Sequence, residues 1–183
     1  MYQYNDDSLM LHNDLYQINM AESYWNDGIH ERIAVFDLYF RKMPFNSGYA
    51  VFNGLKRVVN FIENFGFTNE DITYLKSIGY EEDFLNYLKD LKFTGNIKSM
   101  QEGEICFGNE PLLRVEAPLI QAQLIETILL NIINFQTLIA TKASRIRQIA
   151  THDTLMEFGT RRAQEIDAAL WLSLIHISER AGK

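Results

Sequence analysis

Two short segments hold residue types that could carry chemistry, and the second of them could bind a flat anion. Residues Asn13–Gln17 place polar and aromatic side chains at the start of an expected helix. Residues Leu155–Gln164 have the pattern of a short buried strand, a turn at Gly159 and the start of a helix. That geometry directs free backbone N–H groups and the positive end of the helix dipole to one place. Phe158, just before the turn, offers an apolar face to a flat ring.

Three polar side chains follow this turn and suit an anion. Thr160 provides a hydroxyl donor, and Arg161 and Arg162 provide guanidinium groups that match carboxylate or phosphate oxygens. The spacing alone also fits a plain strand end with solvated arginines, one of them paired with Glu157 or Glu165. Both interpretations stay open at this point.

Composition excludes several classes of partner. The chain has 183 residues, 47% of them hydrophobic, and a formal net charge of −7. An excess of acid argues against sequence-independent binding to nucleic acid and against an anionic membrane surface, whereas a small anion responds to its local pocket. The lone Cys106, the lack of a signal sequence at the start and the lack of a long apolar run predict a soluble cytoplasmic domain.

Several common catalytic patterns are missing from the sequence. The four histidines, His12, His30, His152 and His176, do not lie at ligand spacing from one another or from Cys106, so no metal site is predicted. No P-loop, G-x-G-x-x-G or G-x-S-x-G pattern occurs either. Serine hydrolase, simple NTPase and dinucleotide-binding functions are therefore disfavoured.

Hydrophobic periodicity predicts the elements that position these residues. Apolar residues at helical spacing predict helices over residues 13–26 and 49–65 and over a long stretch from Pro118 to about Ala150. Two shorter helices are also predicted, one capped by Thr68 and one near residues 84–91. The long stretch would span about 50 Å as one helix, so we expect one kink. Residues 33–40 predict a strand buried on at least one face, and residues 95–116 predict short strands with tight turns.

Eight segments occur together in an order that resembles one enzyme family. They are Asn13–Gln17, Phe40–Phe45, Gly48–Ala50, Glu102–Gly103, Glu110–Val115, Leu124–Thr127, Asn131–Lys142 and Glu157–Gln164. The sequence resembles nicotinate phosphoribosyltransferase over this span, from about Leu11 to Trp171.

The resemblance implies a reaction and an assembly. The phosphoribosyl group of phosphoribosyl pyrophosphate would move to the ring nitrogen of nicotinate, giving nicotinate mononucleotide and pyrophosphate in NAD synthesis. Mg²⁺ and ATP hydrolysis through a phosphohistidine are also implied, as is a homodimer with shared sites.

The fold implied by the resemblance is α/β. It consists of an N-terminal α/β sandwich domain over residues 1–117 and the start of an irregular type II phosphoribosyltransferase barrel over residues 118–171.

The resemblance also implies roles for single residues. Tyr16 matches the tyrosine that reaches across the dimer to stack on the pyridine ring, and Phe158 matches the opposite face of that sandwich in the related nicotinamide enzyme. Arg161 matches the arginine beside the pyridine and phosphoribosyl groups, with Thr160 and Arg162 next to it. Lesser candidates for phosphate contact, each better explained by a surface or helix-end role, are Arg41, Lys42, Lys142 and Arg145.

The sequence departs from the family pattern after Trp171. Residues 172–183 form a tail unlike the family, from a deletion or a sequence artefact, and His176 lacks the surroundings of the family's phosphorylated histidine. We therefore expect little or no turnover from this chain alone and a tendency to aggregate. The alternatives are a non-catalytic fragment that binds ligand or a full-length subunit, and a nicotinamide or quinolinate phosphoribosyltransferase relative.

Overall fold

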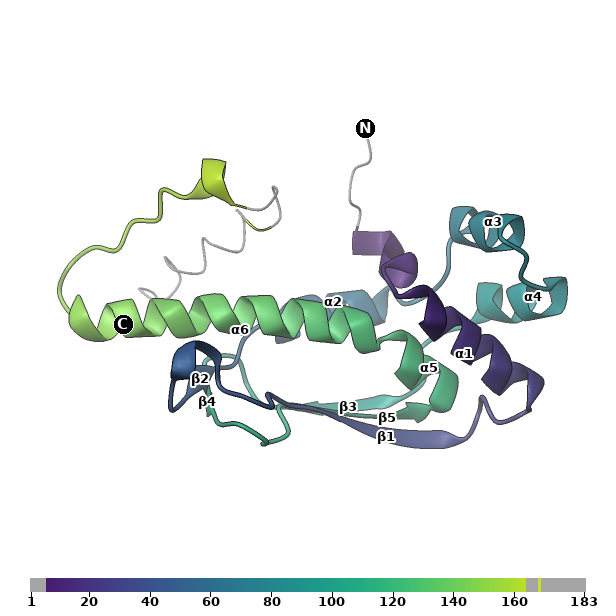
Figure 1. The fold of residues 1–183 in the computed structure, drawn as a ribbon, viewed down its shortest axis with the longest axis horizontal. Helices are drawn as coiled ribbons and strands as arrows, with labels where there is room; N and C mark the ends of the chain where they lie inside the picture. Colours follow the sequence, from purple (N-terminus) through teal and green to yellow (C-terminus); the bar gives the residue numbers. More distant parts are fainter. Residues whose placement is uncertain (1–5, 164–167, 169–183) are drawn as a thin grey trace. The chain divides into compact units, whose positions relative to one another are not determined.

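The fold is described from a computed structural model (Figure 1). The structure describes residues 6–163 and residue 168, so the predicted tail, residues 172–183, lies outside the described residues. The chain forms two compact units, and we describe each by itself. The first unit comprises Met1–Leu38, Lys56–Ser99 and Leu113–Asn131. The second unit comprises Tyr39–Leu55, Met100–Leu112 and Ile132–Lys183.

A three-stranded antiparallel sheet forms one layer of the first unit. The strands are β1 (Ile33–Leu38), β3 (Asn96–Ser99) and β5 (Leu113–Pro118), in the order β1-β5-β3. The central strand β5 alternates buried and exposed residues, as expected for a sheet with one covered face. Its inward side chains include Leu113 and Val115, and its outward ones include Arg114.

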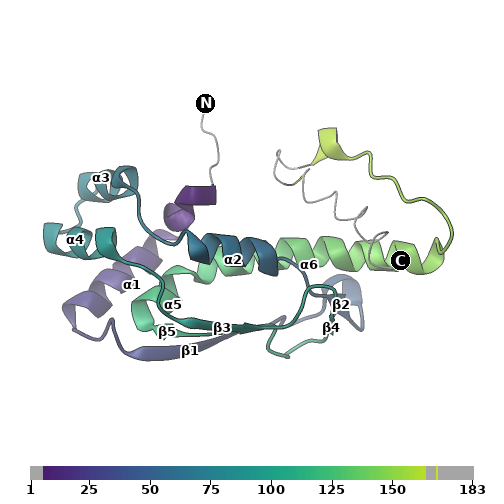
Figure 2. The same ribbon diagram turned by 180° about the vertical axis from the view of Figure 1, so that it is seen from behind.

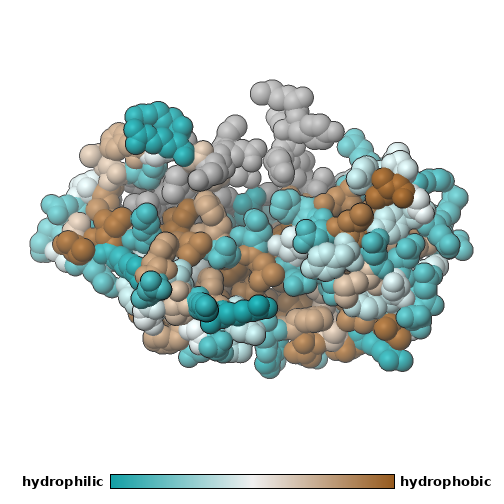
Figure 3. Space-filling model, in the orientation of Figure 1, coloured by the Kyte–Doolittle hydropathy of each residue, from teal (hydrophilic) through white to brown (hydrophobic). Residues whose placement is uncertain are grey.

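The prediction that residues 33–40 form a strand is confirmed for Ile33–Leu38, but the prediction that the strand is buried on at least one face is wrong. Ile33 is 65% exposed, and Val35 and Phe36 are exposed as well. The reason is incomplete cover: β1 is an edge strand paired only with β5, and its Phe36 and Leu38 line a cavity instead of a packed core. Apolar side chains also reach the surface in the second unit, among them Ile105, and brown patches lie between polar ones in Figure 3.

Helices form the other layer of the first unit. Helix α1 (Leu15–Asn26) packs against α5 (Leu119–Leu124), and α5 packs on β1 and β5 (Figures 1 and 2). The positive φ of Gly28, +66°, lets the chain turn away after α1.

Two further helices, α3 (Asn69–Ser77) and α4 (Glu82–Asp90), pack on each other. The predicted cap at Thr68 is confirmed. The Asp71 backbone N–H donates to the Thr68 hydroxyl at 3.1 Å, and the Thr68 N–H donates to the Asp71 carboxylate at 2.7 Å.

The predicted long helix is confirmed together with its break. It consists of α5 and α6 (Glu126–Ile149), separated at Ile125, and α6 contributes residues to both units. At the break the Leu124 carbonyl accepts a hydrogen bond from the Asn13 side chain at 2.9 Å. A side chain that bonds to a helical carbonyl is a recognised cause of such breaks.

The prediction of one helix over residues 49–65 is wrong at its start. Residues Ala50–Val51 form strand β2, which pairs with β4 (Ile105–Cys106), and helix α2 runs only over Leu55–Glu63. Gly54 separates the two elements with φ +109°, a backbone conformation that favours glycine. A Cβ there would lie 3.2 Å from the Ile133 side chain of the same unit, so close packing also requires the glycine.

Buried hydroxyls on α6 hold the backbone around β2. The Val51 N–H donates to the Thr141 hydroxyl at 3.0 Å, and the Asn53 N–H donates to the Thr137 hydroxyl at 3.2 Å. Both threonines are fully buried, so each hydroxyl satisfies a backbone donor that has no strand partner. The second unit also contains the short 3₁₀ turns η2 (Pro44–Asn46) and η3 (Thr160–Arg162). Within residues 6–163 and at 168, no helix combines the length and apolar character that crossing a bilayer requires.

Candidate functional site

The segment Asn13–Gln17 begins α1 and is fixed by its amide side chains. Asp14 takes the extended N-cap conformation, but its carboxylate makes no cap hydrogen bond. Instead the Asn13 amide donates to the Met10 carbonyl at 3.0 Å and to the Leu124 carbonyl at 2.9 Å. One side chain therefore ties the start of α1 to the preceding turn and to the end of α5.

Tyr16 lies on the first turn of α1 and presents its ring to solvent. The residue is 54% exposed, which leaves ring surface available to a flat partner. Its hydroxyl oxygen accepts a hydrogen bond from the Gln17 side-chain nitrogen at 3.1 Å.

Gln17 is the centre of a polar cluster that the sequence predictions missed. Its side-chain nitrogen also donates to Glu126 at 2.7 Å, and its oxygen accepts from the Gln123 amide. Gln17 is 1% exposed, so these bonds satisfy an amide that burial would otherwise penalise. The signal was available: Gln17 and Glu126 both fall in segments that carry the family resemblance, but neither was given a role.

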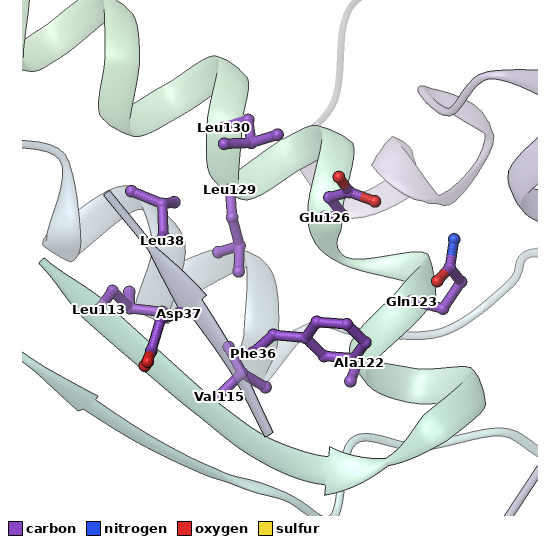
Figure 4. A pocket seen from close by; sticks show the side chains of 10 residues that line it. All are labelled: Phe36, Asp37, Leu38, Leu113, Val115, Ala122, Gln123, Glu126, Leu129 and Leu130. Carbon is purple, nitrogen blue, oxygen red and sulfur yellow. The ribbon is translucent and has the colours of Figure 1, made fainter. Parts of the chain in front are cut away.

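A cavity of about 150 Å³ lies beside this cluster within the first unit (Figure 4). Its lining comes from β1, β5, α5 and α6: Phe36, Asp37, Leu38, Leu113, Val115, Ala122, Gln123, Glu126, Leu129 and Leu130. Most of these side chains are apolar, and the labelled Gln123 and Glu126 lie together at one end of the group in Figure 4. Asp37 is bound by Arg114 through two hydrogen bonds of 2.6 and 2.7 Å, which lower the pKa of the Asp37 carboxyl.

The second predicted segment lies in the other unit and differs from its predicted geometry. The prediction of a buried strand over Leu155–Phe158 is wrong: residues 154–159 form no strand, and Phe158 is 75% exposed. A strand needs a neighbour for its N–H and C=O groups, and no strand among the described residues pairs with this segment.

Where the sequence predicts the start of a helix after the turn, Thr160–Arg162 form the 3₁₀ turn η3, and Ala168 further along is helical. The Gly159 N–H, expected to be free for a ligand, donates to the Glu157 side chain. Arg161 and Arg162 are exposed, and neither has an ion-pair partner in the part of the chain that the structure describes. The structure thus brings Phe158, Arg161 and Arg162 into one short exposed segment, and Thr160 lies in its 3₁₀ turn.

The lesser cationic candidates belong to the second unit. Arg41 and Lys42 are exposed before η2, and Lys142 is exposed on α6. The Arg145 guanidinium lies 5.4 Å from the centre of the Phe45 ring, a cation–π contact that gives this arginine a structural role. Phe45 has φ +59°, which is unusual for a residue other than glycine.

Cys106 belongs to no metal centre among residues 6–163 and 168. Cys106 is buried on β4, and burial raises the pKa of its thiol, which makes it a poor nucleophile at neutral pH. Residues 6–163 and 168 contain no group of three or more His, Cys, Asp or Glu side chains placed to hold an ion.

Comparison with known proteins connects this architecture to one family. Residues 11–134 match the family described as the nicotinate phosphoribosyltransferase (NAPRTase) N-terminal domain. A nicotinate phosphoribosyltransferase of Bacillus subtilis is 61% identical over 171 residues, which is 93% of this chain and 35% of the relative. One from Dictyostelium discoideum is 45% identical over 161 residues, covering 86% of this chain and 27% of the relative.

Solved structures show similarity to the same family. A crystal structure of human nicotinic acid phosphoribosyltransferase superimposes with a TM-score of 0.82 and 36% identity, covering 90% of this chain and 34% of that chain. A nicotinate-nucleotide pyrophosphorylase from Pyrococcus furiosus, at 19% identity and a TM-score of 0.73, shares the fold. The chain spans about a third of the length of the Bacillus and human proteins. Because the family match covers most of the chain, this polypeptide belongs to the nicotinate phosphoribosyltransferase family, with its N-terminal domain in residues 11–134.

Proposed function

We propose that this chain is the N-terminal portion of a nicotinate phosphoribosyltransferase of NAD synthesis. The observation that carries the proposal is the 61% identity over 171 residues to the Bacillus subtilis relative of that name. The substrates would be nicotinate and phosphoribosyl pyrophosphate. The pyridine nitrogen forms a bond to the ribose C1 while the C1–O bond breaks, and pyrophosphate leaves with the bonding electrons. Such a displacement needs positioning and charge neutralisation more than a protein nucleophile.

The exposed side chains have the chemistry that this reaction requires. The Tyr16 ring on α1 is available for stacking, as is the ring of Phe158. Arg161 is a guanidinium with no ion-pair partner among residues 6–163 and 168, and we assign it the anionic groups of the substrates. Thr160 and Arg162 are assigned to the same anions by their place in η3.

Cofactors, assembly and location are further parts of the proposal. ATP hydrolysis would depend on a histidine that we do not assign to this chain, and Mg²⁺ would enter with the phosphates, because substrate phosphates are common ligands of Mg²⁺. A homodimer would bring Tyr16 of one subunit to the site of the other. We place the enzyme in the cytoplasm.

The test measures pyrophosphate release with nicotinate, phosphoribosyl pyrophosphate, ATP and Mg²⁺. We expect no saturable turnover from the 183-residue chain alone. We expect turnover from a chimera in which the matched 171 residues of this chain replace their counterparts in the Bacillus subtilis relative. An inactive, folded chimera would contradict the proposal, and clear turnover by the chain alone would refute the expectation that it is inactive.

Substrate choice and the role of Arg161 are tested in the same chimera. Removal of one charge-assisted contact lowers kcat/KM by about 10- to 100-fold, so we expect that loss in Arg161→Ala with unchanged thermal unfolding. The matched control is Lys89→Ala, an exposed cation in the last turn of α4 (Glu82–Asp90), with an effect below about threefold. Equal losses in both variants would remove the assignment of Arg161. Higher kcat/KM with nicotinamide or quinolinate than with nicotinate would favour those relatives instead.

A further inference from the structure

The Gln17 amide is held in one orientation by three partners. Its oxygen accepts from the Gln123 amide, and its nitrogen donates to Glu126 at 2.7 Å and to Tyr16 at 3.1 Å. Gln123 is itself buried, and its nitrogen also lies 3.9 Å from the Met20 sulfur. A primary amide has two N–H groups, and here each has its own acceptor.

This orientation determines the role of the Tyr16 hydroxyl. A tyrosine hydroxyl has one O–H donor and an oxygen that accepts. Because Gln17 donates to that oxygen, the Tyr16 O–H proton is left to donate to another acceptor. The ring is exposed, so that acceptor can come from a bound molecule.

Glu126, whose carboxylate accepts a hydrogen bond from the Gln17 amide, is exposed to solvent. Glu126 is the first residue of α6 and lies at the end of the cavity in Figure 4, next to Gln123. It is exposed, whereas Gln17 is 1% exposed, so Glu126 can be substituted without opening the buried core. Three elements, α1, α5 and α6, therefore meet at one amide group of the first unit.

We propose that Gln17, anchored by Glu126 and Gln123, is a positioning residue that fixes the Tyr16 hydroxyl as a hydrogen-bond donor to an anionic oxygen of the bound substrates. The inference rests on the proposed function, since it takes Tyr16 to contact substrate. It adds to the stacking role a directional polar contact, and it assigns a function to Gln17, Gln123 and Glu126. The oxygen belongs to a carboxylate of the pyridine or to a phosphate of the sugar donor, because both are anionic acceptors.

The first experiment uses the full 183-residue chain and does not need activity. With ¹³C-labelled tyrosine rings, the NMR signal of Tyr16 is assigned by its loss in Tyr16→Phe. We expect Glu126→Ala to shift this signal, and Glu126→Gln to leave it in place, because a glutamine oxygen can still accept from Gln17. The matched control is Glu70→Ala, an exposed acid in the first turn of α3, which should not move the Tyr16 signal. No shift in Glu126→Ala, or equal shifts in all three variants, would overturn the proposal.

The second experiment uses the chimera with the Bacillus subtilis relative. Loss of a hydrogen bond to a charged group corresponds to about a tenfold effect, so Tyr16→Phe should raise KM about tenfold with kcat within about twofold. A rise in KM for nicotinate identifies the pyridine carboxylate, and a rise for phosphoribosyl pyrophosphate identifies a phosphate. Glu126→Ala should raise the same KM by a smaller factor, and Glu126→Gln should restore it.

The double variant separates positioning from a general structural effect. If Glu126 acts through the Tyr16 hydroxyl, Glu126→Ala adds nothing to Tyr16→Phe, whereas independent effects multiply. Multiplying effects would overturn the positioning role. An inactive parent chimera would overturn the proposed function and the donor role with it, while the NMR result would still decide whether Glu126 holds Tyr16 through Gln17.

Discussion

The two segments assigned to substrate binding differ in how the chain supports them. The anchored segment, Asn13–Gln17, is tied by side-chain amides to the preceding turn, to α5 and to α6. In the exposed segment, Leu155–Arg162, the Gly159 and Arg162 amides bond to residues no more than three positions away, and the phenylalanine and arginines face solvent. The hydrogen bonds of the first unit thus hold the segment that carries Tyr16, whereas Phe158, Arg161 and Arg162 of the second unit lie on an irregular backbone.

This difference matters for binding energy. A side chain that is already held loses little conformational freedom when a ligand arrives, whereas an exposed side chain costs about 0.5–1.5 kcal/mol to immobilise. We therefore infer that substitutions in the anchored segment change both folding and function. Substitutions in the exposed segment should change function alone.

The strongest test of this contrast is the loss of the buried side chain that directly follows the anchored segment in α1. Ile18 lies on α1 and is almost completely buried, so Ile18→Ala should lower the free energy of unfolding by about 2–5 kcal/mol. Met156 is apolar but exposed, and Met156→Ala should change the free energy of unfolding by less than about 0.5 kcal/mol. Urea unfolding of the full chain, followed by circular dichroism, measures both. Similar losses in the two variants would contradict the division between the segments.

A smaller effect is expected from the amide that begins α1. Asn13→Ala removes two hydrogen bonds, and we expect it to lower the free energy of unfolding by about 1–3 kcal/mol. The matched control is Asn64→Ala, in which an exposed amide loses its bond to the Asn60 carbonyl, with a cost below about 0.5 kcal/mol. Asn13→Asp separates size from hydrogen bonding, because a carboxylate cannot donate. If Asn13→Asp unfolds at the same urea concentration as the parent chain, the two bonds do not anchor the segment.

Sequence reasoning worked where local signals decide the structure. The Thr68 cap was predicted because a capping box involves residues only three positions apart. The break in the long helix was predicted from the length of one continuous stretch of sequence. The start of the helix expected at Tyr49 was wrong, since Val51 and Asn53 bond to threonines about 90 residues later in the chain. The exposure of β1 was also missed, because strand order is set by long-range pairing.

The candidate site shows the same limit. The types of residue at Tyr16 and Arg161 could be read directly, since aromatic and guanidinium groups indicate their chemistry. The cluster around Gln17 could not be predicted, because its partners Gln123 and Glu126 lie more than 100 residues away on α5 and α6. The strand expected before Gly159 failed for the related reason that a strand depends on a neighbour, which no local pattern provides.

The smallest expected effect concerns charge at the surface of the first unit, and it tests whether buried amides rather than ion pairs hold that unit together. Arg114 lowers the pKa of Asp37 below its ordinary value of 3.8, so the pair stabilises the folded chain above that value and loses its effect as pH falls through the lower, folded pKa. Asp37→Asn should therefore lower the urea midpoint slightly at pH 7, and the difference from the parent chain should shrink as pH falls below about 4. Because both groups are exposed, salt at about 1 M should also reduce the difference at pH 7. A difference larger than that of Asn13→Ala would show that surface charge, not the buried amides, dominates the stability of this region.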